Sequence, residues 1–427
     1  MSNLLTFFNA HIIDPLNERE TNGSLTIKDG LILGHNIGLK GKLIDCQGMH
    51  LAPGIIDIGV KICEPGERHK ESFRSASEAA AAGGVTTLVT RADTKPAIDN
   101  PETLEFFKNR AKETSQVRIF PSASITKKTK GKVMTEIGFL HQGGAIAFSD
   151  GLNAISDTKT FYQILKYASD YEALIIGHPQ DNSLSKGTSA TNSIFSSLKG
   201  LSSSPDISEK IGLERDVSLV ENLNVRYHAD QITTKKGLEA LKLSKKRNNN
   251  ITAGTSIHHF IFNELDIGNY RTFFKLKPPL RSNTDREALI EALRDGTIDN
   301  ISSIHTPQDE ESKRLPFEEA AYGAVGLETI LPASLSLFHN GEMELYKLFQ
   351  LLSLNPAKII NKKIGSLGEG NPADLIIFDL HKPIKVDRFK LKSKSQNTPF
   401  DSFNLQGENL LTMVGGNIVF KNQSFKL

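Results

Sequence analysis

Three ionisable residues stand where apolar, strand-like runs end, and each could do chemistry there. Lys61 follows IIDIGV, Asp150 ends GAIAFSD, and His178 follows ALIIG. A carboxylate and an imidazole can ligate a metal ion, and with a lysine they can pass protons. Two such ligands are fewer than a typical zinc site has. The residues allow a weak metal site or a metal-free acid–base cluster, but we favour structural remnants.

Histidine and cysteine elsewhere give weaker signals. His258 and His259 are adjacent, so their side chains diverge on a strand or a helix and do not clamp one metal ion. No Cys-His-Asn pattern frames Cys63, which we expect to be a small, partly buried thiol. Only Cys46 accompanies it in 427 residues, which favours a reducing compartment.

Composition excludes several classes of function. Lys and Arg number 51 and Asp and Glu 49, for a net charge of +2, so there is no electrostatic case for nucleic acid or membrane binding. No apolar run reaches the ~18 residues of a membrane span, and the N-terminus does not read as a secretory signal. We therefore expect a cytoplasmic protein of one or two domains.

The elements that must position these residues alternate between strand and helix. Between residues 53 and 366, apolar runs such as GVTTLVT and NITAGTS alternate with helical patterns such as PETLEFFKNRAKE. About eight such units predict an α/β fold with a (β/α)8 TIM barrel. Residues 1–52 and 367–427 read as short strands and predict one small β-sandwich-like domain built from both termini. Residues 182–209, rich in Ser and Gly, predict a long loop near the barrel mouth.

Several motifs resemble those of one enzyme family. Residues 53–66, PGIIDIGVKICEPG, resemble the first-strand signature of the dihydroorotase and hydantoinase branch of the amidohydrolase superfamily, Pro-Gly-x-x-Asp-x-His-x-His-x-Arg-x-Pro-Gly. Residues 275–281, KLKPPLR, resemble its Lys-x-Asn-Pro-Pro-Leu-Arg. The family's wording also recurs at 83–87 (GGVTT), 316–329 (PFEEAAYGAVGLET) and 370–375 (GNPADL). Their order and spacing carry the resemblance along almost the whole chain.

The resemblance implies a metal site that has lost most of its ligands. The family uses zinc, held by histidines at two first-strand positions and by four later residues. Asp150 and His178 remain, but the ligand that is also the catalytic base is replaced by Ile304. The remaining lost positions are Gly59, Lys61 and Gln231. The neighbouring His228 and His305 do not read as replacements. We therefore expect no cofactor and no catalytic residue.

The resemblance also implies a lost substrate site. Family dihydroorotases hold the substrate carboxylate with an Arg, an Asn and a His, whose positions here are Cys63, Asp93 and Gln308. A cysteine removes the bidentate cation, and an aspartate repels an anion. The chain thus resembles inactive dihydroorotase homologues of pyrimidine biosynthesis that act as assembly subunits for aspartate carbamoyltransferase. An active dihydroorotase or other cyclic amide hydrolase with an altered site, a small-molecule-binding module, and a homo-oligomer remain open.

Overall fold

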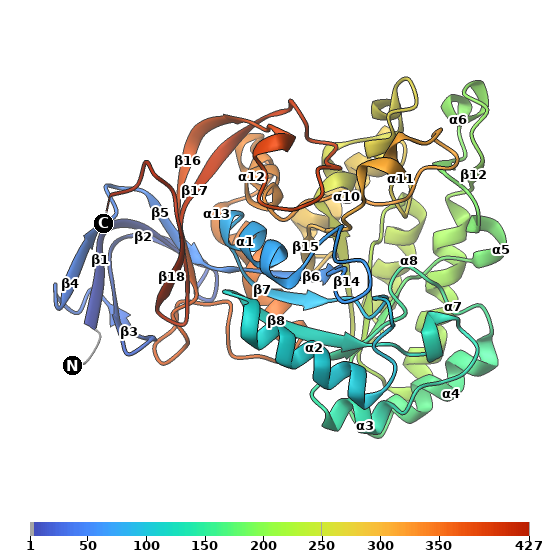
Figure 1. Ribbon diagram of the computed structural model, residues 1–427, viewed down its shortest axis with the longest axis horizontal. Helices are drawn as coiled ribbons and strands as arrows, with labels where there is room; N and C mark the ends of the chain where they lie inside the picture. Colours follow the sequence, from blue (N-terminus) through green and yellow to red (C-terminus); the bar gives the residue numbers. More distant parts are fainter. Residues whose placement is uncertain (1–3, 249, 427) are drawn as a thin grey trace.

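The computed structural model describes residues 4–248 and 250–426, which form a barrel with a β-sheet at its side (Figure 1). Neighbouring barrel strands are parallel, in the order β15-β14-β13-β10-β9-β8-β7-β6. The amide of Lys61, just after β6, donates to the carbonyl of His305, just after β15, at 2.9 Å. The predicted α/β barrel is confirmed. Its strands are β6 (Ile55–Val60), β7 (Val85–Thr90), β8 (Arg118–Ala123), β9 (Ala147–Phe148), β10 (Ile175–Gly177), β13 (Tyr227–Ala229), β14 (Ile251–Ser256) and β15 (Asn300–Ser302).

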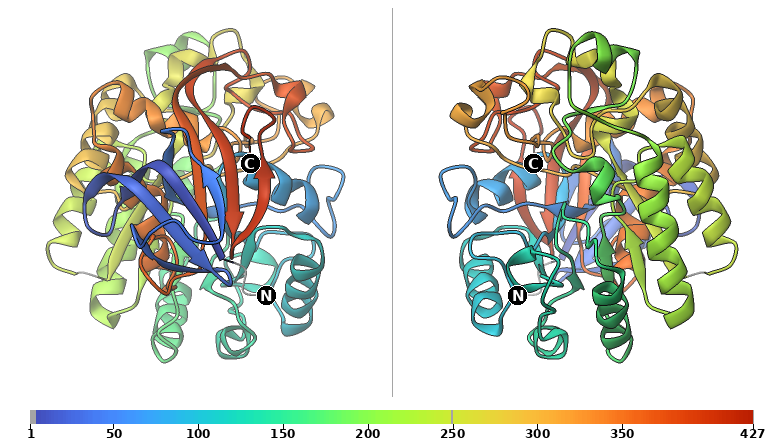
Figure 2. Two further views of the ribbon diagram at one scale, coloured as in Figure 1. Left: turned by 90° about the vertical axis from the view of Figure 1, so that its left-hand side faces the viewer. Right: turned by 90° about the vertical axis from the view of Figure 1, so that its right-hand side faces the viewer.

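Helices lie around the barrel and begin at polar capping residues. The Asn100 side chain accepts from the amide of Thr103, satisfying a free donor in the first turn of the second helix. Ser282 and Asp285 form a capping box, and Gly296, at φ +80°, ends the same helix. Figure 2 shows these helices on the outside. They are α1 (Phe73–Ala82), α2 (Pro101–Thr114), α3 (Ile137–Gln142), α4 (Thr158–Ser169), α7 (Ile207–Leu223), α8 (Lys235–Lys245), α10 (Asn283–Asp295) and α12 (Ile330–His339).

Strands from both ends of the chain form one eight-stranded sheet, as predicted. Leu375 in β16 pairs with Pro53 in β5, which joins the C-terminal strands to the N-terminal ones. Asp29 and Gly30, both at positive φ, make the hairpin turn between β2 and β3. The domain limits at residues 52/53 and 366/367 stay a prediction. The strands are β1 (Leu4–Asp14), β2 (Arg19–Lys28), β3 (Leu31–His35), β4 (Lys42–Asp45), β5 (His50–Pro53), β16 (Leu375–Lys385), β17 (Asn404–Val414) and β18 (Asn417–Lys421).

The predicted loop over residues 182–209 is wrong, because this stretch has its own short elements. It contains α5 (Asn182–Ser185), β11 (Ala190–Thr191), α6 (Ile194–Leu198) and β12 (Ser203–Ser204), and it runs into α7. β11 and β12 pair in parallel. Ser193 and Ser196 form a capping box that starts α6. Side-chain caps therefore stabilise the short helix α6, whereas sequence-based prediction looks for a periodic pattern of apolar residues, which this stretch lacks.

The described helices include none long and apolar enough to cross a membrane.

Candidate functional site

A cavity of about 650 Å³ opens among the loops that follow the barrel strands. Its walls come from the segments after β8, β9, β10 and β14, so it lies at the carboxyl ends of the strands, where barrel enzymes place their active sites. His178, directly after β10, is the one family metal position in its lining. The polar and charged lining residues are Thr129, Lys130, Lys132, Asn153, Ser156, Asp157, His178, Gln180, Asn182, Ser185, Lys186, Thr188, Ser204, Lys277 and Tyr322.

The first strand of the barrel, β6, carries one buried carboxylate, Asp57, and no other side chain that could bind a metal ion. Asp57 is fully buried and accepts hydrogen bonds from the amide (2.9 Å) and the hydroxyl of Ser303. Burial raises the pKa of Asp57 to about 7. Gly59 has φ +95°, and a Cβ on it would lie 2.9 Å from Ile304 Cδ1. A side chain at position 59 is therefore disfavoured by both the backbone and the packing.

An ion cluster occupies the neighbouring ends of β6 and β7. Asp93 Oδ2 lies 3.4 Å from Lys61 Nζ and 2.6 Å from Arg91 Nη2, and Asp93 Oδ1 accepts from Arg91 Nε at 3.0 Å. Arg91 Nη1 also donates to Thr306 Oγ1 at 3.1 Å. Burial alone would raise the pKa of Asp93, but Arg91 and Lys61 hold it far below its usual range. Asp93 thus neutralises cations of its own chain.

The two retained family ligands have different surroundings. Asp150 accepts from the amides of Ile125 and Thr126, both at 2.9 Å, and from the Thr126 hydroxyl. Burial raises the pKa of Asp150 to about 6 despite these bonds. His178 is 4% exposed, and neither ring nitrogen has a hydrogen-bond partner among the described residues. Burial, with Lys277, Arg91 and Arg281 nearby, keeps the pKa of His178 well below its usual value, so the ring is neutral.

The last two family metal positions are filled by side chains that do not bind a zinc ion. Gln231, at φ +62°, directs its amide nitrogen to Asp230 Oδ1 at 3.3 Å and to Ser302 Oγ at 3.4 Å. Ile304, at φ +45°, is buried. Besides contacting Gln231, Asp230 faces position 59, since its Oδ2 is 3.9 Å from where a Cβ on Gly59 would be. Burial raises its pKa to about 6.

These donors do not fit the family's metal centre. Across residues 4–248 and 250–426, no three His, Cys, Asp or Glu side chains are grouped to hold one metal ion. Asp150 is engaged by three donors, and Lys61 and Arg91 place positive charge beside the positions that a cation would need. In the described part of the chain no hydrogen bond or ion pair joins Lys61, Asp150 and His178; Lys61 contacts Asp93, and Asp150 accepts from Thr126.

The three substrate-carboxylate positions have different surroundings. Burial raises the pKa of the Cys63 thiol to about 12, which makes it a poor nucleophile. Gln308 lines a second cavity of about 300 Å³, accepts from Lys70 Nζ at 3.1 Å and donates to the carbonyl of Tyr322 at 2.8 Å. Asp93 is bound to Lys61 and Arg91. Asp93 and Gln308 are thus committed to partners within the chain, and Cys63 is a free, buried thiol.

The remaining histidines also have structural partners. His259 hydrogen-bonds Ser256 Oγ at 2.8 Å and the carbonyl of Pro278 at 3.1 Å. Its neighbour His258 packs against Phe400, with ring centroids 5.6 Å apart, so the two rings diverge as predicted. His228 Nδ1 lies 2.9 Å from Thr252 Oγ1.

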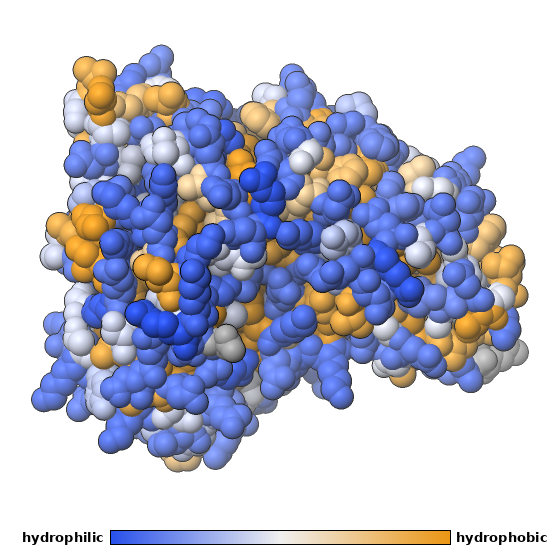
Figure 3. All heavy atoms as spheres, turned by 180° about the vertical axis from the view of Figure 1, so that it is seen from behind, coloured by the Kyte–Doolittle hydropathy of each residue, from blue (hydrophilic) through white to orange (hydrophobic). Residues whose placement is uncertain are grey.

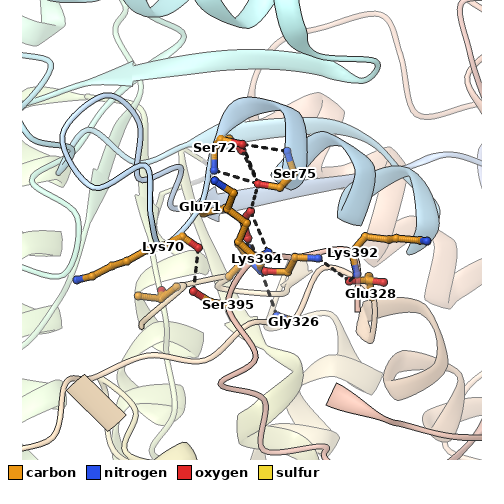
Figure 4. A network of polar contacts seen from close by, with 12 residues as sticks. Lys70, Glu71, Ser72, Ser75, Gly326, Glu328, Lys392, Lys394 and Ser395 are labelled. Atoms are coloured by element: carbon orange, nitrogen blue, oxygen red, sulfur yellow. Dashed lines mark hydrogen bonds and ion pairs between the residues drawn. The ribbon is translucent and has the colours of Figure 1, made fainter. Parts of the chain in front are cut away.

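The segment between β16 and β17 is fastened to the barrel by a buried acidic network (Figure 4). Glu71, before α1, accepts from the hydroxyls of Ser75 and Ser393. His305 accepts from the amide of Gly326 through Nδ1 and donates through Nε2 to Glu71 at 3.2 Å. Burial would raise the pKa of Glu71, but the bonds from His305 and Ser393 lower it. The histidine beside Ile304 therefore holds this segment in place.

Sequence reasoning missed three charged residues of the mouth: Arg91, Asp230 and Lys277. Arg91 and Asp93 are two apart, so an extended segment places them on one face, and their opposite charges were a usable signal. Lys277 replaces the Asn of the family's Lys-x-Asn-Pro-Pro-Leu-Arg motif, and this departure was visible in KLKPPLR. No pattern marked Asp230, because its neighbours come from other strands.

Comparisons with known proteins agree with the fold and with the motifs. The family model described as Dihydro-orotase-like matches residues 48–237. L-Hydantoinase (dihydropyrimidinase) from Arthrobacter aurescens superposes with a TM-score of 0.89, at 22% identity over 99% of this chain and 97% of that one. Dihydropyrimidinase from Brevibacillus agri NCHU1002 gives a TM-score of 0.86, at 17% identity over 100% and 96%. These two structures establish the fold alone.

Sequence relatives are closer. The dihydroorotase of Bacillus pumilus (strain SAFR-032) is 38% identical over 89% of this chain and 89% of its own. That of Ehrlichia chaffeensis (strain ATCC CRL-10679 / Arkansas) is 38% identical over 98% of this chain and 95% of its own. At this identity over nearly the full length of both chains, the protein belongs to the dihydroorotase family.

Proposed function

We propose that this chain is a non-catalytic member of the dihydroorotase family that acts by association in pyrimidine biosynthesis. One observation carries the proposal: the six family metal positions retain only Asp150 and His178. A hydrolase of this kind needs a metal ion to activate water and a base to take its proton. Ile304, at the base position, has no group that accepts a proton.

The charge pattern of the mouth supports the same reading. The Lys61 ammonium and the Arg91 guanidinium place two fixed positive charges beside Asp93. Position 59 is a glycine, which offers no ligand, and Lys61 belongs to an ion cluster with Arg91 and Asp93. This cluster balances its charges within the chain and needs no metal ion to do so. A chain that keeps the family's fold but has lost its metal-binding and catalytic groups favours a role in assembly.

Aspartate carbamoyltransferase is the partner we propose, and self-association is compatible with it. A candidate contact surface is α6, where Ile194 and Leu198 are 80% and 82% exposed and lie four residues apart on one helix face. The apolar spot at the upper left of Figure 3 lies over this helix. Exposed apolar side chains gathered at one place are typical of protein contact sites.

Size-exclusion chromatography of the two proteins from one organism, mixed and separate, tests the partnership. Co-elution with higher carbamoyltransferase activity in the mixture is expected, because a scaffold subunit stabilises its partner's assembly. The double substitution Ile194→Ser with Leu198→Ser should separate the proteins if α6 makes the contact. The matched control is Phe139→Ser on α3, also an exposed apolar side chain (63%). Separate elution, with full activity without this chain, contradicts the proposal.

A second candidate is an active dihydroorotase or related cyclic amide hydrolase. It is favoured by the name that the 38% identical relatives carry. Hydrolysis of dihydroorotate by the purified chain, measured with and without added zinc, separates the two candidates.

A further inference from the structure

The cavity at the barrel mouth carries an unusual concentration of unpaired positive charge. Lys130, Lys132, Lys186 and Lys277 line it, against a single carboxylate, Asp157. None of these four lysines is within ion-pair distance of a carboxylate in the described part of the chain. The chain as a whole is nearly neutral, at +2. With four lysines and one aspartate, the lining has a formal net charge of +3, which exceeds the +2 of the whole chain.

The four lysines come from three separate segments. Lys130 and Lys132 lie in the loop after β8, Lys186 follows α5, and Lys277 lies in the long connection after β14. Asp157 does little to offset them, because its carboxylate caps α4 by accepting from the amide of Thr160 at 2.6 Å. Some lysines elsewhere in the chain do have a carboxylate partner; Lys245, for example, lies 2.8 Å from Asp299. The barrel thus brings together cations whose counter-charge the chain does not provide.

A buried group in the same lining points to a ligand. Among the residues that the structure describes, neither ring nitrogen of His178 has a hydrogen-bond partner, although only 4% of the residue is exposed. A buried polar group without a hydrogen bond costs free energy, so its retention indicates a partner outside the chain. In either protonation state an imidazole ring has at least one N–H to donate. Asn153, Asn182 and Tyr322 add polar groups, and Leu276 and Pro279 add apolar wall.

We propose that this cavity is a binding site for a phosphorylated small molecule, with its phosphate held by Lys277 and His178 and the rim lysines adding attraction. A phosphate monoester carries close to two negative charges at neutral pH, which suits four unpaired cations. The cations of the lining are all lysines, whose compact ammonium groups bind phosphate as point charges. The volume of about 650 Å³ accommodates a small metabolite. The inference rests on the proposed loss of the metal, because a metal ion on His178 would occupy the same nitrogen atom.

Isothermal titration calorimetry of the full chain with inorganic pyrophosphate tests the site, and succinate at matched ionic strength tests the alternative class of anion. We expect saturable binding of pyrophosphate that weakens with added salt, and no comparable binding of succinate. Lys277→Gln should weaken binding about tenfold, since one charge-assisted hydrogen bond is lost. Lys130→Gln with Lys132→Gln, both at exposed positions, should weaken it several-fold without affecting folding. The control, Lys358→Gln on the exposed face of the helix Asn355–Ile359, should bind as wild type.

Three results would overturn the site: no saturable binding of pyrophosphate, tighter binding of succinate, or unchanged affinity in both lysine variants. Zinc analysis of the same sample separates this inference from the proposed function. Zinc-free protein that does not bind pyrophosphate refutes the anion site alone. Stoichiometric zinc that copurifies with the chain contradicts the proposed loss of the metal, whatever the titration gives.

Discussion

Replacing Asp93 by asparagine restores the family's residue at that position, yet we expect it to destabilise the protein. Asp93 neutralises Arg91, whose side chain is only 5% exposed, through contacts of 2.6 Å to Nη2 and 3.0 Å to Nε. It also lies 3.4 Å from Lys61 Nζ. Breaking a buried ion pair from one side costs about 3–5 kcal/mol, because an uncompensated charge stays behind. Asp230 remains near Arg91 and asparagine still accepts one hydrogen bond, so we expect the lower end, about 3 kcal/mol.

The assay is urea unfolding followed by far-ultraviolet circular dichroism, since the chain has no tryptophan. Arg91→Met with Asp93→Asn removes both charges of the bidentate pair and should recover all but about 1 kcal/mol. Because the pKa of Asp93 is lowered in the folded state, its contribution is present above its unfolded pKa of about 4 and is lost as the pH falls further. The difference between wild type and Asp93→Asn should therefore shrink below about pH 4. Wild-type stability of Asp93→Asn at pH 7, or a double variant that is no more stable than Asp93→Asn, refutes the reasoning.

Three other substitutions test separate parts of the site. Gly59→Ala should lower the free energy of unfolding by about 2 kcal/mol, because φ is +95° and the new Cβ would lie 2.9 Å from Ile304 Cδ1; unchanged urea unfolding contradicts this. The pKa of Asp57 is raised to about 7 in the folded state, so the free energy of unfolding of wild type should fall by about 1.4 kcal/mol for each unit that the pH rises from 4 to 7, relative to Asp57→Asn. Parallel pH profiles of the two proteins would contradict this. Gly59→His with Lys61→His should not create dihydroorotase activity, because position 304 still lacks a base; zinc-dependent turnover by this variant contradicts the assignment of Ile304.

The sequence predicted the barrel well because its signal is local. Each buried parallel strand is a short apolar run, and the helices between them have capping residues such as Asn100 and Ser282. The same regularity placed Lys61, Asp150 and His178 at strand ends, which is where the structure has them. Residues 182–209 were mispredicted because their order comes from side-chain caps and a two-residue strand pair.

The interactions within the site depend on barrel closure, which no local pattern encodes. From the sequence alone, we expected Asp93 to repel an anionic substrate. In the structure its carboxylate instead forms ion pairs with Arg91 and with Lys61, which follows the neighbouring strand β6. From the sequence we expected Gln308 at a carboxylate site, but in the structure its side chain binds Lys70 and the carbonyl of Tyr322. The unpaired lysines of the mouth lie up to about 150 positions apart in the sequence, between Lys130 and Lys277, and converge only in the fold.

The most direct test of the central claim is the rate of dihydroorotate hydrolysis by the purified chain after incubation with zinc. The claim predicts a rate equal to that of the zinc solution alone, because the chain retains Asp150 and His178 but has no base at Ile304. Turnover that rises with protein concentration, requires zinc and disappears with a chelator would contradict it.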